Sequence, residues 1–292
     1  MKQAAFNLLP PANIALVLLF WTFAPIAWVN GSWTLTIVGV TTVAFVQLVE
    51  WLNERHAGWR IDRREFFTDA FYVALNTFAI SWLSKTLADH PIDVLKKSLG
   101  IATPWLMELP FLVQAAMVVV IVEFGQYWLH RLMHHNALFW STHAPHHHIT
   151  KLNAAKGYVG NPIELFLISL SVVGFFDFDK AAMFAAFNTM GVIAVYAHAN
   201  VRSDPPIWYS YVFTTIRHHS LHHTALSYED TRCNYANCLI LLDRIFRTYR
   251  EGESEVVGQD ERRRLSIKEQ FAFPVRAWID RAQAKRVAAG PN

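Results

Sequence analysis

The sequence has little charge and very few cysteines. Only 17% of its 292 residues are charged, against about 25% in typical soluble domains, while 53% are hydrophobic. The two cysteines, Cys233 and Cys238, are too few for a disulfide framework. No CxxC partner accompanies them, so we expect buried thiols rather than metal ligands. The net charge of +3, without a basic cluster interleaved with aromatics, argues against nucleic acid as a partner. This composition predicts a membrane protein.

Several cofactor and catalytic signatures are also missing. The sequence has no glycine-rich dinucleotide fingerprint, no CxxCH haem motif and no cysteine run suited to an iron–sulfur cluster. It also lacks the HExxH motif found in many zinc hydrolases. If the chain catalyses a redox reaction, we therefore expect its electrons to come from a separate donor protein.

Six apolar segments approach the roughly 20 residues that a helix needs to cross a bilayer. The first two form a hairpin across a turn at Asn30-Gly31. The N-terminal segment has one lysine and no small-residue cleavage site, which indicates an anchor rather than a cleaved signal. The fifth segment is short for a span, and it is alternatively half of a re-entrant or interfacial hairpin. The six segments are 13–29, 33–52, 66–84, 105–129, 163–178 and 181–199.

The positions of Lys and Arg predict an orientation. Basic residues follow the second span, the fourth span and residue 199, whereas the turn at 30–32 has none. With a cytoplasmic N-terminus, six crossings place all three basic regions in the cytoplasm, and Lys85, Lys96 and Lys97 fall on the far side. The expected fold class is all-α, with multi-pass transmembrane helices and a cytoplasmic histidine-rich cap. Its expected parts are a transmembrane hairpin at 1–53, a metal-site domain at 54–250 and a polar cytoplasmic tail at 251–292.

Nine of the fourteen histidines form four clusters close to the ends of apolar segments. Residues four apart share one helix face, so both imidazoles of HRLMH, and those of HSLHH, can reach one metal ion. In HAPHH, proline is tolerated in a first helical turn, so we expect His143 to reach the metal from a loop just outside the helix. Burying this many imidazoles without a ligand would be costly. The predicted metal ligands are His130, His134, His143, His146, His147, His198, His219, His222 and His223.

The number of histidines exceeds the needs of one ion. Structural zinc usually has four ligands, and catalytic zinc has three protein ligands and a water. Two ions with about four ligands each fit the count better. Nitrogen-rich sites without thiolate suit iron, zinc or copper, and the sequence does not choose among them. His135, His148 and His218 flank the clusters and are expected to lie outside the ligand set.

Five polar residues near the clusters are candidates for hydrogen bonds that orient the ligands. Glu123 and Gln126 precede His130 by seven and four residues and so share its helix face. A carboxylate inside an apolar run is costly unless it has a function. Asn200 follows His198 closely enough to orient it. Asn234 and Asp243 complete the set, and helix capping is an equal alternative for these two and for Asn200.

With these motifs in place, the sequence resembles the fatty acid hydroxylase / sterol desaturase superfamily over roughly residues 54–250. The resemblance implies two iron ions held by the nine histidines (zinc is possible in the isolated protein), with O2 as co-substrate. It also implies hydroxylation or desaturation of a lipid C–H bond with two electrons from a partner. We expect the lipid in an apolar slot walled by the spans around 105–129 and 163–199. The matching stretches are ERHAGWRIDRREFFTDAFYVALNT (54–77), EFGQYWLHRLMH (123–134), HAPHH (143–147), YAHANV (196–201), HSLHH (219–223) and NYANCLILLDRIFRTY (234–249).

Two other classes of function stay open. One is a membrane zinc hydrolase that acts through zinc-bound hydroxide. The other is a non-enzymatic metal carrier or bis-histidine haem anchor, although a transporter more often places its polar residues at mid-span than at one membrane face. Fatty acids, sterols, carotenoids, alkanes and ether lipids all suit an apolar slot. Hydroxylation and desaturation both begin with hydrogen abstraction, so the sequence does not separate them.

Overall fold

The architecture consists of helices joined by turns and loops. The structure is a computed structural model that describes residues 2–225, 229–259 and 262–288. Within these ranges there is no β-strand, and only two isolated bridges join extended residues. The all-α prediction is confirmed.

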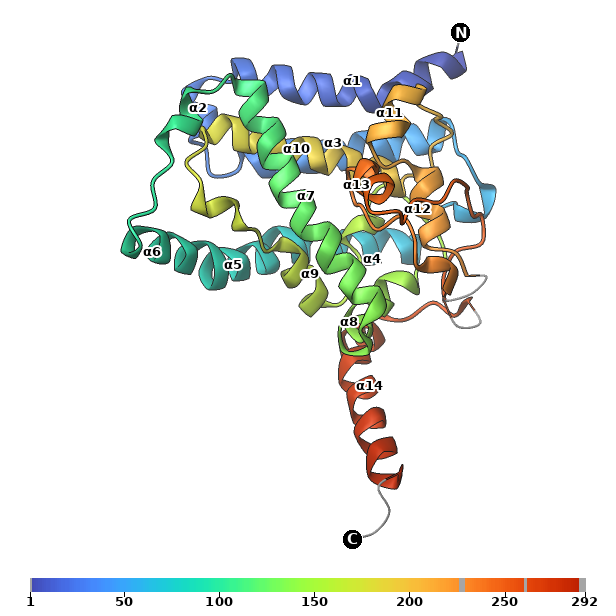
Figure 1. Ribbon diagram of the computed structural model, residues 1–292. Coiled ribbons are helices and arrows are strands. Elements are labelled where there is room, and N and C mark those ends of the chain that lie inside the picture. The colour runs from blue at the N-terminus through green and yellow to red at the C-terminus, as the bar shows by residue number, and fades with distance from the viewer. Residues whose placement is uncertain (1, 226–228, 260–261, 289–292) are drawn as a thin grey trace.

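Four helices are long and apolar enough to cross a membrane: α1 (Lys2–Phe23), α3 (Thr34–Leu52), α7 (Phe111–His135) and α10 (Lys180–His198). They overlap four of the six expected spans, although α1 begins and ends earlier in the chain than the expected span 13–29. Helix α10 is the most buried of them and packs against the other three. In Figure 1, α1, α3 and α10 run alongside one another, and α7 crosses α10 obliquely. Large apolar side chains such as Leu16 and Leu48 stay exposed on the outer faces, as expected for helices surrounded by lipid.

The other two expected spans are not among the helices with the length and apolarity to cross a membrane. The segment 66–84 belongs to a longer helical stretch that contains Asp69 and Asn76. This stretch consists of α4 (Arg63–Ala74), a π-helical segment (Leu75–Ile80), α5 (Ser81–Ser84), a second π-helical segment (Lys85–Asp89) and α6 (His90–Ser98). The segment 163–178 contains only the short α9 (Pro162–Ser169) and a 3₁₀ turn (Val172–Phe175). The first is divided among several short helical elements, and the second is too short.

The chain nevertheless passes six times between the two ends of the molecule. Lys96, in α6, forms an ion pair of 2.5 Å with Asp177, and the Asp179 backbone N–H donates to Gln114 at the start of α7. The end of α6 and the beginnings of α7 and α10 therefore lie together, at the end opposite the C-termini of α3 and α10. The stretch 63–98 thus carries the chain from one end to the other, as does 162–175 (Figure 1).

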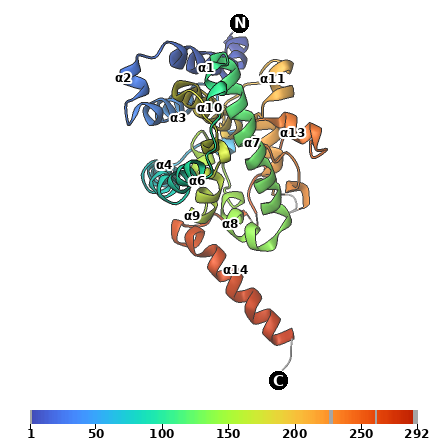
Figure 2. The ribbon, with the colours of Figure 1, turned by 60° about the vertical axis from the view of Figure 1, so that its left-hand side comes forward.

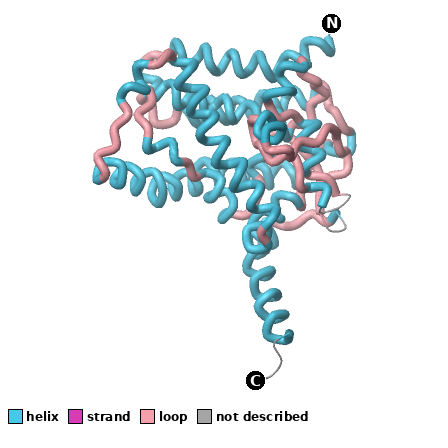
Figure 3. The backbone as a smooth tube through the Cα atoms, viewed as in Figure 1, coloured by secondary structure: helices cyan, strands magenta, loops and turns pink. Residues whose placement is uncertain are grey.

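Short helices and loops gather at the end where α3, α7 and α10 finish (Figure 3). They include α8 (Ala137–His147), α11 (Ile207–Val212), α12 (Ile216–His222) and α13 (Ile240–Ile245); the four-residue α2 (Ile26–Val29) lies at the opposite end. The C-terminal α14 (Ile267–Ala288) packs on α8, where the Trp278 indole N–H donates to the Ser141 hydroxyl at 2.6 Å. Figures 1 and 2 both show α14 leaving the body across the direction of α1 and α10.

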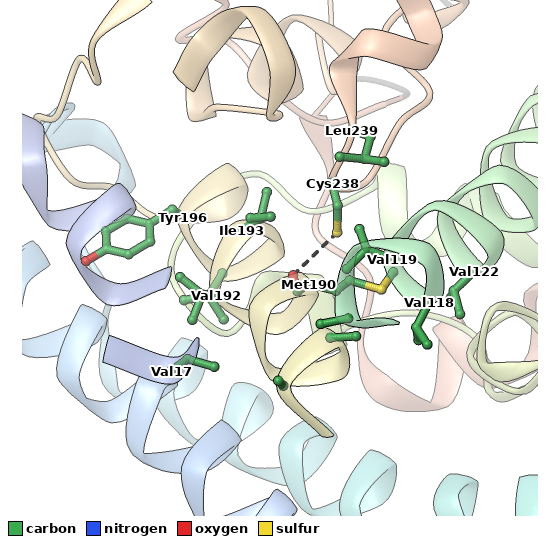
Figure 4. Close-up of a cluster of buried hydrophobic side chains, with 14 of the residues drawn as sticks. Val17, Val118, Val119, Val122, Met190, Val192, Ile193, Tyr196, Cys238 and Leu239 are labelled. Carbon is green, nitrogen blue, oxygen red and sulfur yellow. Dashed lines mark hydrogen bonds between the residues drawn. The ribbon is translucent and has the colours of Figure 1, made fainter. Parts of the chain in front are cut away.

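An apolar core joins α7 to α10. Val118 and Val122 of α7 meet Met190 of α10, and the segment around Cys238 closes over this contact (Figure 4). The Cys238 thiol donates to the Met190 carbonyl at 3.4 Å. Both Cys233 and Cys238 are buried and free, so the expectation of buried thiols is confirmed. This core holds the two histidine-bearing helices in register.

Candidate metal centre

The nine histidines singled out in the sequence come together at one end of the molecule, in two buried groups. Within each group the ligand atoms of all rings lie within 4.8 Å of one another. Helices α8 and α12 contribute to both groups, so the two groups are neighbours, and the His147 and His223 rings stack across them at 4.4 Å. The first group is His130, His134, His143, His147 and His222, and the second is His146, His198, His219 and His223.

The connection between α7 and α8 positions the first group. Asn136 ends α7, and its side-chain oxygen accepts from the Leu138 backbone N–H at 2.9 Å, so it caps the start of α8. The expectation that His143 reaches the site from a loop is wrong. Because α8 begins at Ala137, Pro145 falls near its C-terminal end, and His143 lies inside the helix. One helical hydrogen bond is lost there, and the helix stops two residues later.

In the first group, lone pairs of imidazole nitrogens face one another. The Nδ1–H of His130 donates to the Tyr235 carbonyl at 2.6 Å, and that of His222 donates to the Cys233 carbonyl at 2.7 Å. A neutral imidazole has only one N–H group, so the Nε2 atoms of both rings carry no hydrogen and act as acceptors. These two Nε2 atoms are only 3.0 Å apart. Two acceptors at this distance repel unless a cation lies between them.

The second group repeats this arrangement. The Nδ1–H of His198 donates to the Ala194 carbonyl at 2.8 Å, and its Nε2 lies 2.9 Å from that of His219. His146 donates from Nδ1 to the Val159 carbonyl at 2.7 Å. With metal–nitrogen bonds of about 2.1 Å, ligands at right angles around one ion are about 3.0 Å apart. The spacing of the Nε2 atoms therefore fits rings that share a metal ion.

The environment keeps the rings in the form that binds metal. Burial lowers the pKa of His143 to about 3. Burial, together with the neighbouring imidazoles, also holds the pKa values of His147 and His222 well below the ordinary value of 6.5. The imidazoles are therefore neutral at physiological pH, as coordination requires.

Glu164 is a contact of the centre that the sequence analysis missed. Its carboxylate accepts from the Nδ1–H of His143 at 2.5 Å and is 2% exposed. Its second oxygen is buried without a hydrogen-bond partner and lies against Gly160, where a Cβ would approach to 2.5 Å. A carboxylate behind a ligating histidine fixes its tautomer and raises its basicity. Glu164 lies in an apolar segment, so the signal that drew attention to Glu123 was available here too.

Three of the expected orienting residues contact other groups. Glu123 accepts from the Cys238 backbone N–H at 2.8 Å, and Gln126 donates to the Ile168 carbonyl at 3.1 Å. Helical periodicity placed them near the correct face, but the chain segments that pack beside α7 take up their polar atoms. The Asn200 side chain bonds the backbone of His56, because the chain turns away after α10 ends at His198. None of these three side chains bonds a ligand histidine.

Asn234 and Asp243 act on the centre through the backbone. The Asp243 carboxylate accepts from the N–H groups of Tyr235 and Ala236, at 2.8 and 2.9 Å. The Asn234 amide donates to the His218 and Arg250 carbonyls. Together they fix the loop whose carbonyls accept from His130 and His222. They therefore orient the rings indirectly, through the backbone, and neither caps a helix.

The three flanking histidines lie outside both groups. The His135 Nε2 is 3.0 Å from the Tyr235 hydroxyl, and the His148 ring packs on Phe273. His218 is 3.3 Å from the Thr215 hydroxyl. This placement agrees with their expected position beyond the ligand set.

A slot of about 620 Å³ opens onto the histidines. Its walls include His130, His143, His146 and His198 at one end, together with parts of α7, α9 and α10, which is where the sequence analysis placed them. The stretch 76–93, residues 157–159 and the segment at Asn237 and Cys238 form the remaining walls and were not expected there. The centre therefore faces a cavity whose walls come from several helices.

Comparison with known proteins adds a second line of evidence. The fatty acid hydroxylase family model matches residues 115–248. An ornithine lipid hydroxylase of Rhizobium tropici is 26% identical over 230 residues, which are 73% of this chain and 66% of that protein. A probable Delta(7)-sterol 5(6)-desaturase of Neurospora crassa is 26% identical over 51% of this chain and 42% of its own length. Human alkylglycerol monooxygenase is 27% identical over 47% of this chain and 30% of its own length.

The matched region thus spans less than two thirds of each of these three relatives. The region that the family model matches contains all nine histidines. No solved structure gives a significant match.

Proposed function

Because the chain belongs to the fatty acid hydroxylase / sterol desaturase superfamily, we propose that it is a membrane-bound di-iron oxidoreductase. It would use O2 and electrons from a separate protein to hydroxylate or desaturate a lipid C–H bond. Hydroxylation places one oxygen atom in the C–H bond and releases the other as water, with two electrons and two protons from outside. Desaturation removes two hydrogens and releases two waters, with the same electron demand.

The observation that carries this proposal is the division of nine imidazoles into a group of five and a group of four. Each group is large enough for one ion, and the neighbouring groups suit a metal pair. Two iron ions held by these histidines would supply the activation of O2. Iron accepts nitrogen-rich sites without thiolate, and this donor set fits it.

The residues of the chain orient and protect this centre. Backbone carbonyls and Glu164 take the Nδ1–H groups, so that the Nε2 atoms point inward. His130 and His198 lie where the slot meets the two groups, so a lipid chain in the slot brings its C–H bonds to the centre. The buried, mostly apolar walls keep water away from the reacting carbon.

The alternative functions fit this geometry less well. A catalytic zinc site keeps three protein ligands and an open position, whereas these groups supply five and four imidazoles. A bis-histidine haem anchor needs two rings on opposite faces of a porphyrin. Here the facing Nε2 atoms are 2.9 to 3.1 Å apart, which is too close to accommodate a macrocycle.

We also propose that the histidine end faces the cytoplasm and receives electrons there. Arg55, Arg60 and Arg64 lie at this end, as the positive-inside rule expects of a cytoplasmic face. A polar pocket of about 480 Å³ is lined by Arg217, His218 and other residues of the cap, and His218 directly precedes His219 of the second group in the chain. It offers a donor protein a short approach to the second group.

Metal analysis and turnover of the purified full chain test the proposal. We expect about two irons per chain, and a lipid product that appears only with O2 and a reducing partner. NAD(P)H alone should support no turnover. Equal product under anaerobic conditions, or full activity with zinc in place of iron, would overturn the assignment.

A further inference from the structure

One face of α10 lines the slot from His198 through Ala194, Gly191 and Phe187 to Met183. At 1.5 Å per helical residue, the distance from Met183 to His198 is about 22 Å. A wall of this length can accommodate an extended hydrocarbon chain.

The polar groups in the slot walls are largely satisfied within the protein. Asn76 donates to the Tyr158 carbonyl at 3.0 Å, and Gln126 donates to the Ile168 carbonyl. Ser84 and Ser169 hydrogen-bond to each other. Because these groups already have partners, they leave few polar atoms for a ligand. Asp89 and Asp93 also line the slot, on the stretch 76–93, and Asp93 pairs with Lys97. The wall that α10 forms between Met183 and Ala194 is apolar and suits a hydrocarbon chain.

Gly191 occupies a special position in this wall. It lies in the interior of α10, where glycine is disfavoured relative to alanine. A Cβ built on Gly191 meets no atom within 4 Å, so the missing side chain leaves open slot rather than making room for a neighbour. Gly191 is seven residues from His198, or about 10 Å along the helix. Beyond it, Phe187 and Met183 are bulkier.

We propose that Gly191 sets how far the hydrocarbon chain of the lipid substrate continues past the metal centre. The inference rests on the proposed function. The methyl end passes Gly191 toward Phe187 and Met183, which are apolar, and the polar head stays toward the cap. A side chain at position 191 would then shorten the slot without touching the histidines.

The test substitutes leucine at two helical glycines of the full chain. Gly191→Leu fills the slot, whereas Gly125→Leu places the same side chain on the exposed face of α7, where a Cβ also meets nothing within 4 Å. Native mass spectrometry in detergent, with saturated fatty acids of graded length, measures which chains are retained. We expect Gly191→Leu to weaken binding of the longest chains at least about 10-fold relative to shorter ones, and Gly125→Leu to bind as the wild type does.

Unchanged retention of the long chains by Gly191→Leu would overturn the inference. If Gly191→Leu does not fold, Gly191→Ala and Gly191→Val should give a graded, smaller shift. The same variants are compared for the chain length of their oxygen-dependent lipid products. A binding shift in protein that makes no such product would leave the slot assignment standing and refute the proposed oxidoreductase.

Discussion

Two buried polar clusters lie close together in this molecule and differ in what they need from outside. Lys156, which is 2% exposed, bonds the carboxylates of Glu65 and Asp69. Arg264 reaches the other oxygen of Glu65 at 2.8 Å. The cationic side chains of this ion-pair cluster therefore belong to the cluster itself. The two histidine groups include no lysine or arginine, and their acceptor nitrogens face one another at about 3 Å. The balance of donors and acceptors therefore distinguishes a structural cluster from a ligand site.

The ion-pair cluster also has a clear structural task. It joins α4 to the segment 153–156, where the Asn153 amide donates to Asp69 at 2.8 Å. The same segment leads into Gly157, where a Cβ would lie 3.3 Å from the His198 ring. One cluster thus fixes the backbone against which a ring of the other cluster packs.

The largest expected effect comes from removing a ligand. His222→Ala deletes one imidazole of the first group and its bond to the Cys233 carbonyl. We expect loss of bound metal and a fall in activity of more than about 100-fold, because even orienting residues behind a ligand affect metal affinity 10- to 100-fold. Metal content, turnover and membrane insertion are measured together, with exposed His90→Ala as the matched control. Full metal content in His222→Ala would show that His222 is not a ligand.

A large loss of stability is expected from the other cluster. Lys156→Met leaves Asp69 buried without a cation and Glu65 with Arg264 alone, which costs about 3–5 kcal/mol. Thermal unfolding in detergent measures the loss. The exposed Lys97, paired with Asp93, provides the control variant Lys97→Met, with a change of about 0–1 kcal/mol. If Lys156→Met released metal without lowering stability, the two clusters would not be separable as described.

A moderate effect is expected at Glu164. In Glu164→Gln the side chain still accepts from His143 but loses its charge, so we expect metal affinity to fall about 10-fold. Competition with a chelator measures the affinity, and the exposed Glu108→Gln is the control. The deletion Glu164→Ala should weaken binding further. Unchanged affinity in both variants would remove Glu164 from the centre.

The smallest effect is expected at Asn200. Its side chain bonds the backbone of His56 rather than a ligand ring. We expect Asn200→Ala to lower stability by about 1 kcal/mol and to leave metal affinity unchanged within about twofold. Thermal unfolding and chelator competition provide the two readouts. A larger fall in metal affinity than in stability would restore Asn200 as an orienting residue of the centre.

The sequence identified much of this site because local rules apply to it. Spacings of three and four place His219, His222 and His223 on one side of a short helix and its end, whatever surrounds it. The same rule was applied to Glu123 and Gln126 and failed there. Periodicity gives the direction of a side chain but not the segment that it meets. Pro145 led to a wrong prediction for His143 for a related reason. Proline was expected near the start of a helix, whereas the Asn136 cap starts α8 eight residues earlier.

Two of the six expected spans show a similar limit. Hydropathy found α1, α3, α7 and α10, because long apolar runs need little context. The stretch 63–98 carries polar groups, including Asn76 and Ser84, that face the slot or bond other segments. Its passage from one end of the molecule to the other is visible only when Lys96 is seen beside Asp177.

From the sequence alone, the nine histidines could be placed at one end of a helical membrane protein, because helical repeat and apolar length are local properties. The tertiary structure decided which rings form the group of five and which the group of four. It also supplied the groups that hold them, namely the carbonyls of Val159, Ala194, Cys233 and Tyr235 and the carboxylate of Glu164. Every residue has a carbonyl, so only packing in three dimensions can select the ones that orient a metal ligand.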